Sequence, residues 1–259
     1  MSLSRFLLLS SASAGIGLMY LAHNHFSVIR RAQCSLWATV EHIESHPMTL
    51  LDPSGHPTQQ DSSCIRIPVR KLKADLSNEE ILRRFTYGYF GGWIFTPERV
   101  LLRLFRLSIT KISALDDIHR NRELSLVPNN WSLSALSRTR SPPLGSLLFG
   151  NFLLLDCSAA SVQERNQIYS SPVQACKPNH AFAEFIAGSD KSVFAVSQRF
   201  EVVREESGPG HETEWVIITA SHILCNPLTG QRIIPDWMGL FHRIYAKLLF
   251  ADGILEVLR

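Results

Sequence analysis

The sequence predicts an α+β fold in which an antiparallel sheet grips a long C-terminal helix, with a transmembrane or signal-anchor helix at the N-terminus. Two segments near the end of the chain, Phe194–Val202 and Trp215–Leu224, alternate in hydrophobicity with period two, which is typical of strands. From Trp237 to Leu249, apolar residues instead recur at the spacing of a one-sided helix. The third observation is an apolar run at the N-terminus, Phe6–Ala22.

Length and composition narrow the function classes. At 259 residues the chain has the length of one domain with extensions, and its 45% hydrophobic and 19% charged residues are typical of a globular protein. A net charge of +3 is too small to indicate a nucleic-acid partner, and the basic residues form no stripe with interleaved aromatics. The five cysteines are scattered and never spaced as C-x-x-C, so we expect neither a metal site nor a disulfide scaffold.

The run Phe6–Ala22 is apolar or small throughout and is flanked by Arg5 and Arg30–Arg31. Its length is at the lower edge for a membrane helix, and its small residues leave a cleaved signal peptide open as an alternative. We favour an uncleaved anchor over residues 1–30, because the apolar stretch Gly17–Leu21 continues past the small residues. The chain is then a single-pass membrane protein, expected in the endoplasmic reticulum. Positive charges at both ends leave its orientation undecided.

Leu7–Leu9 followed by Ser13–Gly17 looks at first like the strand and glycine turn of a short-chain dehydrogenase. The earlier spaced glycine, the acidic residue about 20 positions on and a Tyr-x-x-x-Lys motif are all missing, so we expect no nucleotide cofactor. The sequence also lacks a G-x-S-x-G elbow, an H-E-x-x-H motif and a P-loop. An enzyme of this sequence is therefore expected to work without a cofactor.

Residues 31–63 are expected to form a linker, because the part that holds Pro53, Gly55 and Pro57 is polar. Residues 64–259 are expected to form one α+β domain. That domain begins with a short strand over Cys64–Leu72, whose residues alternate in polarity.

Two helices are predicted next. Ser77–Glu80 is a capping box that starts the first helix, which Gly91–Gly92 ends. Thr96–Glu98 starts the second helix, with Pro at its first turn and Glu near the positive end of the dipole. Four apolar residues are expected to form the buried face of this second helix: Val100, Leu101, Leu104 and Phe105.

Aromatic residues gather between these two helices and on the final one. They are expected either to pack a helix corner and the core or to form the wall of an apolar ligand pocket. The candidate residues for lining such a pocket are Tyr87, Tyr89, Trp93, Trp237, Phe241 and Tyr245.

The middle of the chain, Asp116–Ser146, is rich in Ser, Arg, Asn and Pro and is expected to be irregular. It holds one glycosylation sequon at Asn130, which is usable only if the domain is luminal. Two further strands are predicted after it, over Leu147–Cys157 and His180–Ala187.

Three predicted strands carry an ionisable group on a largely apolar face: Asp156, Glu184 and His222. If these faces line one cavity, burial would raise the pKa values of the carboxyl groups and place the histidine near a partner carboxylate. Such groups can act as general acids and bases in catalysis. The alternatives are that Asp156 caps a turn, that Glu184 faces solvent and that His222 bonds a backbone group in the core.

The order of three strands and a long C-terminal helix across residues 147–258 resembles the helix-grip arrangement of the START and polyketide-cyclase-like superfamily. The segment from His180 to the end is also similar to the end of an uncharacterised bacterial family with such a fold. The resemblance implies a lipophilic ligand between sheet and helix, which some members only bind and others cyclise, dehydrate or hydrolyse without a cofactor. A small anchored protein of this kind is also similar to accessory proteins of fungal secondary-metabolite pathways.

These observations together favour a membrane-anchored, cofactor-independent isomerase, cyclase or hydrolase that acts on a lipophilic metabolite, with His222 as the acid–base group. A non-catalytic carrier of a lipid or hydrophobic ligand is the second hypothesis. A structural or scaffolding membrane protein with a filled core is the third. A cavity of roughly 300 Å³ or more between sheet and helix would favour the first two.

Overall fold

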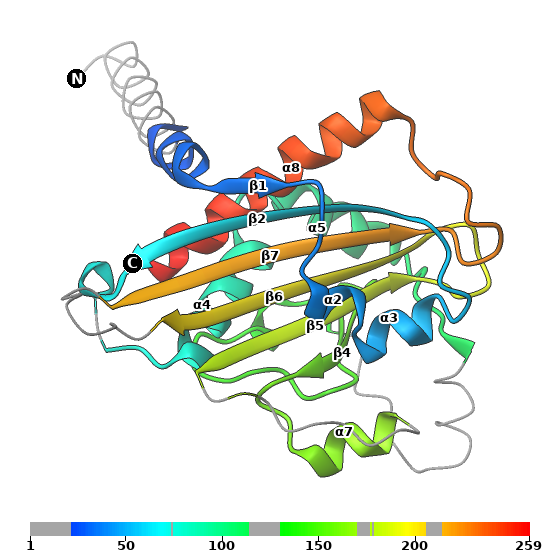
Figure 1. Cartoon of the computed structure of the whole chain (residues 1–259), viewed down its shortest axis with the longest axis horizontal. Helices are drawn as coiled ribbons and strands as arrows, with labels where there is room; N and C mark the ends of the chain where they lie inside the picture. Colours follow the sequence, from blue (N-terminus) through cyan, green and yellow to red (C-terminus); the bar gives the residue numbers. More distant parts are fainter. Residues whose placement is uncertain (1–21, 74, 114–129, 170–176, 178, 206–213) are drawn as a thin grey trace, which may run out of the picture.

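The computed structural model of the chain describes residues 22–73, 75–113, 130–169, 177, 179–205 and 214–259. Over these residues the protein is α+β, with one seven-stranded antiparallel sheet and a long helix at the C-terminus (Figure 1). The order of strands across the sheet is β1-β2-β7-β6-β5-β4-β3. The strands are β1 (Gln33–Ser35), β2 (Thr58–Pro68), β3 (Leu147–Leu148), β4 (Phe152–Cys157), β5 (His180–Gly188), β6 (Ala195–Glu205) and β7 (Trp215–Cys225).

Helices cover both faces of the sheet. The helices α2 and α3 lie on one face, and α4, α5 and α8 lie behind the sheet on the other (Figure 1). Besides the helical residues 22–31, the described helices are α2 (Val40–Ile43), α3 (His46–Leu51), α4 (Asn78–Gly91), α5 (Thr96–Phe105), α7 (Val162–Ile168) and α8 (Asp236–Val257). The capping box predicted at Ser77 and Glu80 is confirmed, with both of its reciprocal hydrogen bonds present.

The main core lies between the sheet and the layer that α4 and α8 share. The ring of Phe85 in α4 packs edge-on against Phe200 of β6, 5.1 Å between centroids, and against Phe250 of α8 at 5.5 Å. A Cβ atom on Gly253 would lie 2.6 Å from the Phe85 ring, and one on Gly88 would lie 2.6 Å from the Cβ of Glu256. Only glycine permits this approach of the two helices, so α4 stands between most of α8 and the centre of the sheet.

The segment 31–63, expected to be a linker, carries β1, α2, α3 and the first half of β2. The strand β2 pairs with β7 along its whole length, from Thr58 opposite Cys225 to Pro68 opposite Trp215. Its polar start is therefore held by backbone hydrogen bonds rather than by apolar side chains, which is why its composition resembles that of a linker.

No helix among the described residues is both long and apolar enough to cross a membrane. The anchor predicted over Phe6–Ala22 lies outside the described residues except for its last position. The four described cysteines, Cys34, Cys64, Cys157 and Cys225, are free thiols. From 130 to 146 the chain is mostly irregular, as expected, and Asn130 is partly buried with its backbone bonded to Leu147 and Phe149.

The buried face predicted for the second helix is wrong. Val100, Leu101, Leu104 and Phe105 of α5 are 52 to 70% exposed, and α5 contains no buried residue. The helix makes few contacts with the sheet and the other described helices, so its apolar face stays largely exposed. The helical spacing of apolar residues indicates that one face of a helix is apolar, but it does not indicate which element covers that face.

Candidate functional site

A cavity of about 420 Å³ lies between the inner face of the sheet and the helices α4, α5 and α8. This volume is within the usual range for small-molecule sites. Most of its wall is apolar. Side chains that form this wall include Phe95, Leu102, Phe152, Val196, Leu224 and Leu249. Four residues predicted from the sequence also line it, namely His222, Tyr89, Phe241 and Tyr245.

His222 in the cavity wall is hydrogen-bonded to two other polar side chains. Its Nε2 is 3.0 Å from the hydroxyl of Tyr89 in α4, and its Nδ1 is 3.2 Å from Oδ1 of Asp61 in β2. Asp61 and His222 lie directly opposite each other in the β2–β7 pairing, which places them together. Since a carboxylate only accepts hydrogen bonds, we assign the proton of neutral His222 to Nδ1, so that Nε2 accepts from Tyr89.

Electrostatics distinguish the two ends of this relay, which consists of Tyr89, His222 and Asp61. Burial works to raise the pKa of Asp61, but its hydrogen bond to His222 and the nearby positive charges outweigh burial, and the pKa is lowered. Asp61 is therefore an ionised carboxylate at neutral pH. Burial raises the pKa of Tyr89 well above its ordinary value. The Tyr89 hydroxyl is thus a proton donor rather than a phenolate at the cavity surface.

Gln198 of β6 lies next to the relay, directly opposite His222 in the β6–β7 pairing. The side chain lines the cavity and is only 4% exposed. Its buried amide nitrogen lies close to the Tyr89 hydroxyl and partly opposes the effect of burial on the pKa of Tyr89, but the contact lacks the geometry of a full hydrogen bond. A buried donor without a full partner costs about 1–3 kcal/mol. Gln198 therefore presents one donor to an acceptor oxygen on a ligand, and Tyr89 presents a second one when Nε2 of His222 is protonated.

A second polar pair in the cavity wall comes from the helices. The hydroxyl of Tyr245 in α8 donates to Oε2 of Glu98 in α5, at 2.7 Å. Burial raises the pKa of Glu98, and the Tyr245 hydrogen bond only partly opposes this. A carboxylate with a raised pKa is a stronger base than a solvated one, so Glu98 is suited to accept a proton from a ligand.

Three side chains at the cavity could hold a metal ion: Asp61, His222 and His242 of α8. One ligand atom from each lies within 4.8 Å of the others, and Nε2 of His242 is 3.6 Å from Oδ2 of Asp61. Two imidazoles and a carboxylate form a ligand set for zinc or iron. Burial, then the charge of His222, lowers the pKa of His242, which keeps it neutral and able to ligate. We call these three residues the Asp61 cluster.

The other two predicted catalytic residues lie on the opposite face of the sheet. Asp156 was expected to share a face with Phe152 and Leu154, and that expectation is wrong. A β-bulge between Leu154 and Asp156 shifts the register, so that Asp156 pairs with Glu184 and points toward Arg165, 3.8 Å away. The hypothesis that Asp156, Glu184 and His222 meet in one cavity therefore fails, because the sheet separates the carboxyl groups from the histidine.

Glu184 belongs to a buried polar network that holds α2 and α3 on the sheet. Its Oε1 accepts hydrogen bonds from Ser45 at 2.6 Å and from Ser197 at 2.8 Å, and its Oε2 pairs with Arg199 at 3.0 Å. His42 of α2 bridges Ser221 and Ser197 in the same network, at 2.7 and 2.9 Å. Glu184 and His42 are fully buried, so we interpret this network as structural.

Three of the predicted ligand-binding aromatics do not line the cavity. Tyr87 lies under the guanidinium of Arg138, 4.2 Å from ring centroid to Cζ. Trp93 packs edge-on against His25 at 5.8 Å and is 48% exposed. Trp237 is 70% exposed at the start of α8. Tyr87 and Tyr89 are two residues apart, so a helix turns their side chains about 200° away from each other.

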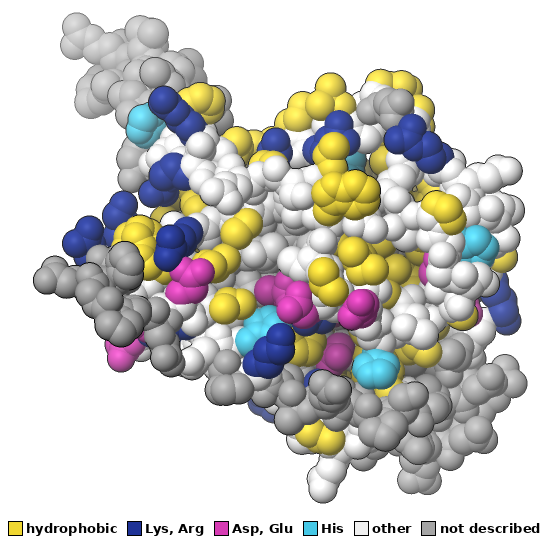
Figure 2. Space-filling model, viewed as in Figure 1, with side chains coloured by type: hydrophobic (Ala, Val, Ile, Leu, Met, Phe, Trp, Pro, Cys, Tyr) yellow, Lys and Arg dark blue, Asp and Glu magenta, His cyan; other side chains and the backbone are white. Residues whose placement is uncertain are grey.

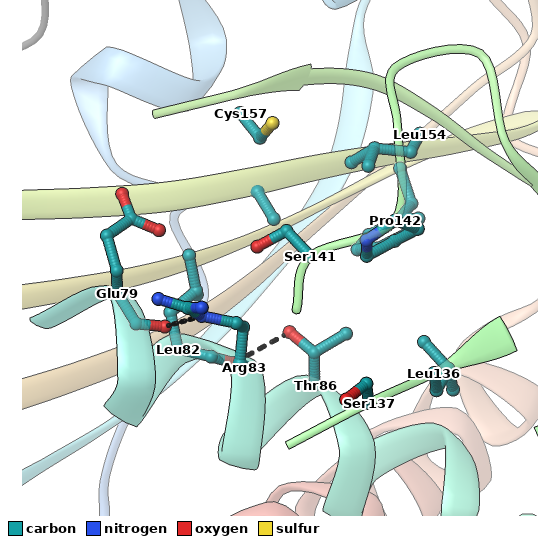
Figure 3. Close-up of a pocket in the computed structure, with 12 residues that line it drawn as sticks. Glu79, Leu82, Arg83, Thr86, Leu136, Ser137, Ser141, Pro142, Leu154 and Cys157 are labelled. Carbon is teal, nitrogen blue, oxygen red and sulfur yellow. Dashed lines mark hydrogen bonds between the residues drawn. The ribbon is translucent and has the colours of Figure 1, made fainter. Parts of the chain in front are cut away.

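A smaller hollow lies between the start of α4 and β4 (Figure 3). Around it, Arg83 donates to the backbone oxygen of Glu79 and Thr86 to that of Leu82, both along the helix. Its volume of about 20 Å³ has room for one or two water molecules. Burial raises the pKa of the Cys157 thiol in its wall to about 12, so this thiol is no nucleophile. We assign no ligand to this hollow.

Sequence reasoning missed Glu98, Asn151 and Gln198 in the wall of the main cavity, and Asp61, which contacts His222. For Asp61 a signal was present. The alternation of Ile67 and Ile65 continues backward through Ser63 to Asp61, on the same face. Its polar neighbours made this stretch resemble a linker. The sequence predicted for Glu98 only the role of an acidic residue that stabilises the start of a helix.

The chain matches no protein-family model, no curated protein and no solved structure.

Proposed function

We propose that this protein is a cofactor-independent isomerase or cyclase that moves protons on a carbonyl-bearing lipophilic substrate. The observation that carries the proposal is the Tyr89–His222–Asp61 relay in the wall of an apolar cavity of about 420 Å³. The finer expectations belong to the same proposal. They are that the sheet and α8 hold the ligand in a helix-grip manner and that residues 1–30 anchor the domain to a membrane, as in the endoplasmic reticulum.

The proposed reaction begins with the substrate carbonyl oxygen between Tyr89 and Gln198. When His222 carries a second proton, its Nε2–H donates to the Tyr89 oxygen, and the Tyr89 hydroxyl can donate to the carbonyl. Glu98 takes a proton from the carbon beside the carbonyl. Tyr89 gives its proton to the oxygen and regains one from His222, and the product of this step is an enol.

The second half of the reaction reverses these transfers at another atom. Protonated Glu98 returns its proton to a different carbon, or the enol carbon attacks a second carbonyl group of the same substrate and closes a ring, while Glu98 gives its proton to the oxygen of that second carbonyl as its C=O double bond becomes a single bond. The enol proton goes back through Tyr89 to His222. Asp61 stays ionised throughout and stabilises the imidazolium. No electrons are gained or lost, so the reaction needs no redox cofactor.

A hydrolase that works through a covalent intermediate is less well supported. Among the described residues that line the cavity there is no Ser, Thr, Cys or Lys. Such a mechanism requires one of these nucleophiles or an activated carboxylate. Glu98 is bonded to Tyr245 and is better placed to accept a proton.

The second candidate function is a carrier of a lipophilic ligand. The apolar cavity favours it, because binding alone needs no relay. The two functions differ in their dependence on single polar atoms. Replacing Tyr89 by Phe removes one oxygen and leaves the apolar wall in place, so a carrier would keep its ligand and an isomerase would lose its chemistry.

The experiment is deletion of the gene, followed by metabolite profiling and complementation with variants. We expect an intermediate to accumulate in the deletion strain, and Tyr89→Phe, His222→Ala and Asp61→Asn to leave it accumulated. Proton transfer contributes about 10²- to 10⁴-fold to a rate, so turnover by these variants should fall by at least about 100-fold. Tyr87→Phe is the matched control in the same helix and should complement fully. Full complementation by all three relay variants would exclude the catalytic role and favour the carrier.

A further inference from the structure

Two helices carry apolar faces that are largely exposed over the described residues. One is the face of α5, where Leu104 is 70% and Phe105 is 63% exposed. The other is the first half of α8, where Trp237 is 70% and Leu240 is 55% exposed. Both patterns predict burial from the sequence. Exposed apolar patches of this kind in soluble domains mark interaction surfaces.

These faces adjoin the mouth of the ligand cavity. Leu102 of α5 and Ile109, four residues after its end, line the cavity from one side. Met238 and Phe241 line it from the first half of α8. Ile109 is 51% and Phe241 is 69% exposed, so both reach from the cavity wall to the surface. A ligand that leaves the cavity between these helices meets an apolar surface rather than water.

The charges around the two faces are mostly positive. Between residues 96 and 111 the chain carries Arg99, Arg103, Arg106 and Lys111 against a single acidic residue, Glu98, which is bonded to Tyr245. The helix α8 adds Arg243 and Lys247, both half-buried. In Figure 2, hydrophobic side chains gather along the upper edge over the first half of α8, with Lys and Arg beside them. Apolar helices flanked by basic residues are typical of segments that lie in an anionic membrane interface.

The start of the described chain leads to the same side of the sheet. Residues 22–31 are helical and follow the predicted anchor Phe6–Ala22. His25 Nε2 lies 2.8 Å from Oδ1 of Asp252 in α8, and Val28 is buried in the main core. Figure 1 shows residues 22–31 at the upper left and the first half of α8 at the upper right, on the same upper side of the molecule. An anchor that enters a bilayer above this side would leave the first half of α8 facing the same bilayer.

We propose that α5 and the first half of α8 dock on the surface of an anionic lipid bilayer, so that the cavity opens into the lipid. The occupant of these faces is then the bilayer itself, and the basic side chains contact its phosphate groups. This inference deepens the proposed function, because it states where a lipophilic substrate enters. It does not need the catalytic relay to be correct, since a carrier would load its ligand by the same route.

Two native tryptophans allow a matched test. Trp237 on α8 is 70% exposed and Trp37, on the opposite face of the sheet, is 72% exposed. The full chain is reconstituted into vesicles of phosphatidylcholine with or without phosphatidylglycerol, and its fluorescence is quenched with brominated lipids. The three other tryptophans, Trp93, Trp131 and Trp215, contribute a background that is the same in each comparison with wild type. We expect Trp237→Phe to lower the quenching of the chain and Trp37→Phe to leave it unchanged. Replacing Leu104 and Phe105 together by Glu should likewise lower it, whereas Val40→Glu on α2 should not.

The outcomes separate the proposal from its rivals. Quenching of Trp237 that is strong with phosphatidylglycerol and weak without it supports docking on an anionic surface. Equal quenching of both tryptophans, of neither, or of Trp237 without dependence on phosphatidylglycerol overturns it. Shielding of Trp237 that rises with protein concentration in the absence of lipid would identify a second copy as the occupant. Because quenching does not depend on turnover, a Tyr89→Phe variant that docks normally but is inactive tests the two proposals separately.

Discussion

Replacing Glu184 by Gln should change how the stability of the fold depends on pH. Glu184 is fully buried on the outer face of the sheet, where burial raises the pKa of its carboxyl group to about 7 and Arg199 and two serine hydroxyls only partly oppose this. Its ordinary value is 4.5. Between these two values the folded chain holds a proton that the unfolded chain releases. The contribution of Glu184 to stability is therefore full below pH 4.5 and is lost as the pH rises through 7.

The magnitude follows from the two pKa values. One unit corresponds to about 1.4 kcal/mol, so the shift from 4.5 to about 7 amounts to at most about 3 kcal/mol of unfolding free energy. Burial also raises the pKa of Asp156, to about 6, so the contribution of Asp156 to stability is likewise lost as the pH rises. The contribution of Glu201 to the pH dependence has the opposite sign. Burial works to raise the pKa of Glu201, but its hydrogen bonds and Arg199 outweigh burial and lower the pKa to about 2. Its effect therefore falls below the pH range in which Glu184 titrates.

The assay is urea unfolding of wild type and Glu184→Gln at pH 4.5, 6 and 7.5. The variant loses part of its pairing with Arg199, so its absolute stability is not the test. We expect the difference between variant and wild type to move in favour of the variant by up to about 3 kcal/mol from pH 4.5 to 7.5. Glu41→Gln, an exposed position on α2 of the same face, should show no such trend. Parallel pH curves for Glu184→Gln and wild type would refute the reasoning.

The remaining predictions concern the helix crossing and the question of a metal. Gly253→Ala should lower the unfolding free energy by about 1–3 kcal/mol, because the new methyl group meets the Phe85 ring. Gly239→Ala, in the same helix but with no other atom closer than 3.9 Å, should instead be neutral or gain up to about 1 kcal/mol. Equal losses in both would contradict the close packing of α4 and α8. Dialysis against EDTA should leave turnover unchanged, whereas a loss that Zn²⁺ restores would show that the Asp61 cluster holds a catalytic metal.

Local periodicity was sufficient to predict much of the fold. The alternation of β6 and β7 and the helix over Trp237–Leu249 are all present in the structure. So is the capping box at Ser77. These features depend on residues within one or two turns or one strand of each other, so the sequence contains all of the information that they require. The same alternation placed His222 on the inner face of β7, where it lines the cavity.

The site itself needed contacts between distant residues. Asp61 becomes the partner of His222 only because β2 pairs with β7 across 161 positions of sequence. A single bulge in β4 moved Asp156 to the far side of the sheet. Alternation of polar and apolar residues within one strand indicates neither the pairing nor the bulge, because both are set by hydrogen bonds between strands.

By itself, then, the sequence determined most of the strands and helices after residue 64 and which of their faces are apolar. Only the tertiary structure decided what each face meets. It put Glu184 into a buried network on one side of the sheet and His222 at a cavity on the other. It also left the apolar face of α5 and the first half of α8 exposed. The physical reason is that hydrophobic spacing is a property of one segment, whereas burial depends on the surfaces that other segments bring to it.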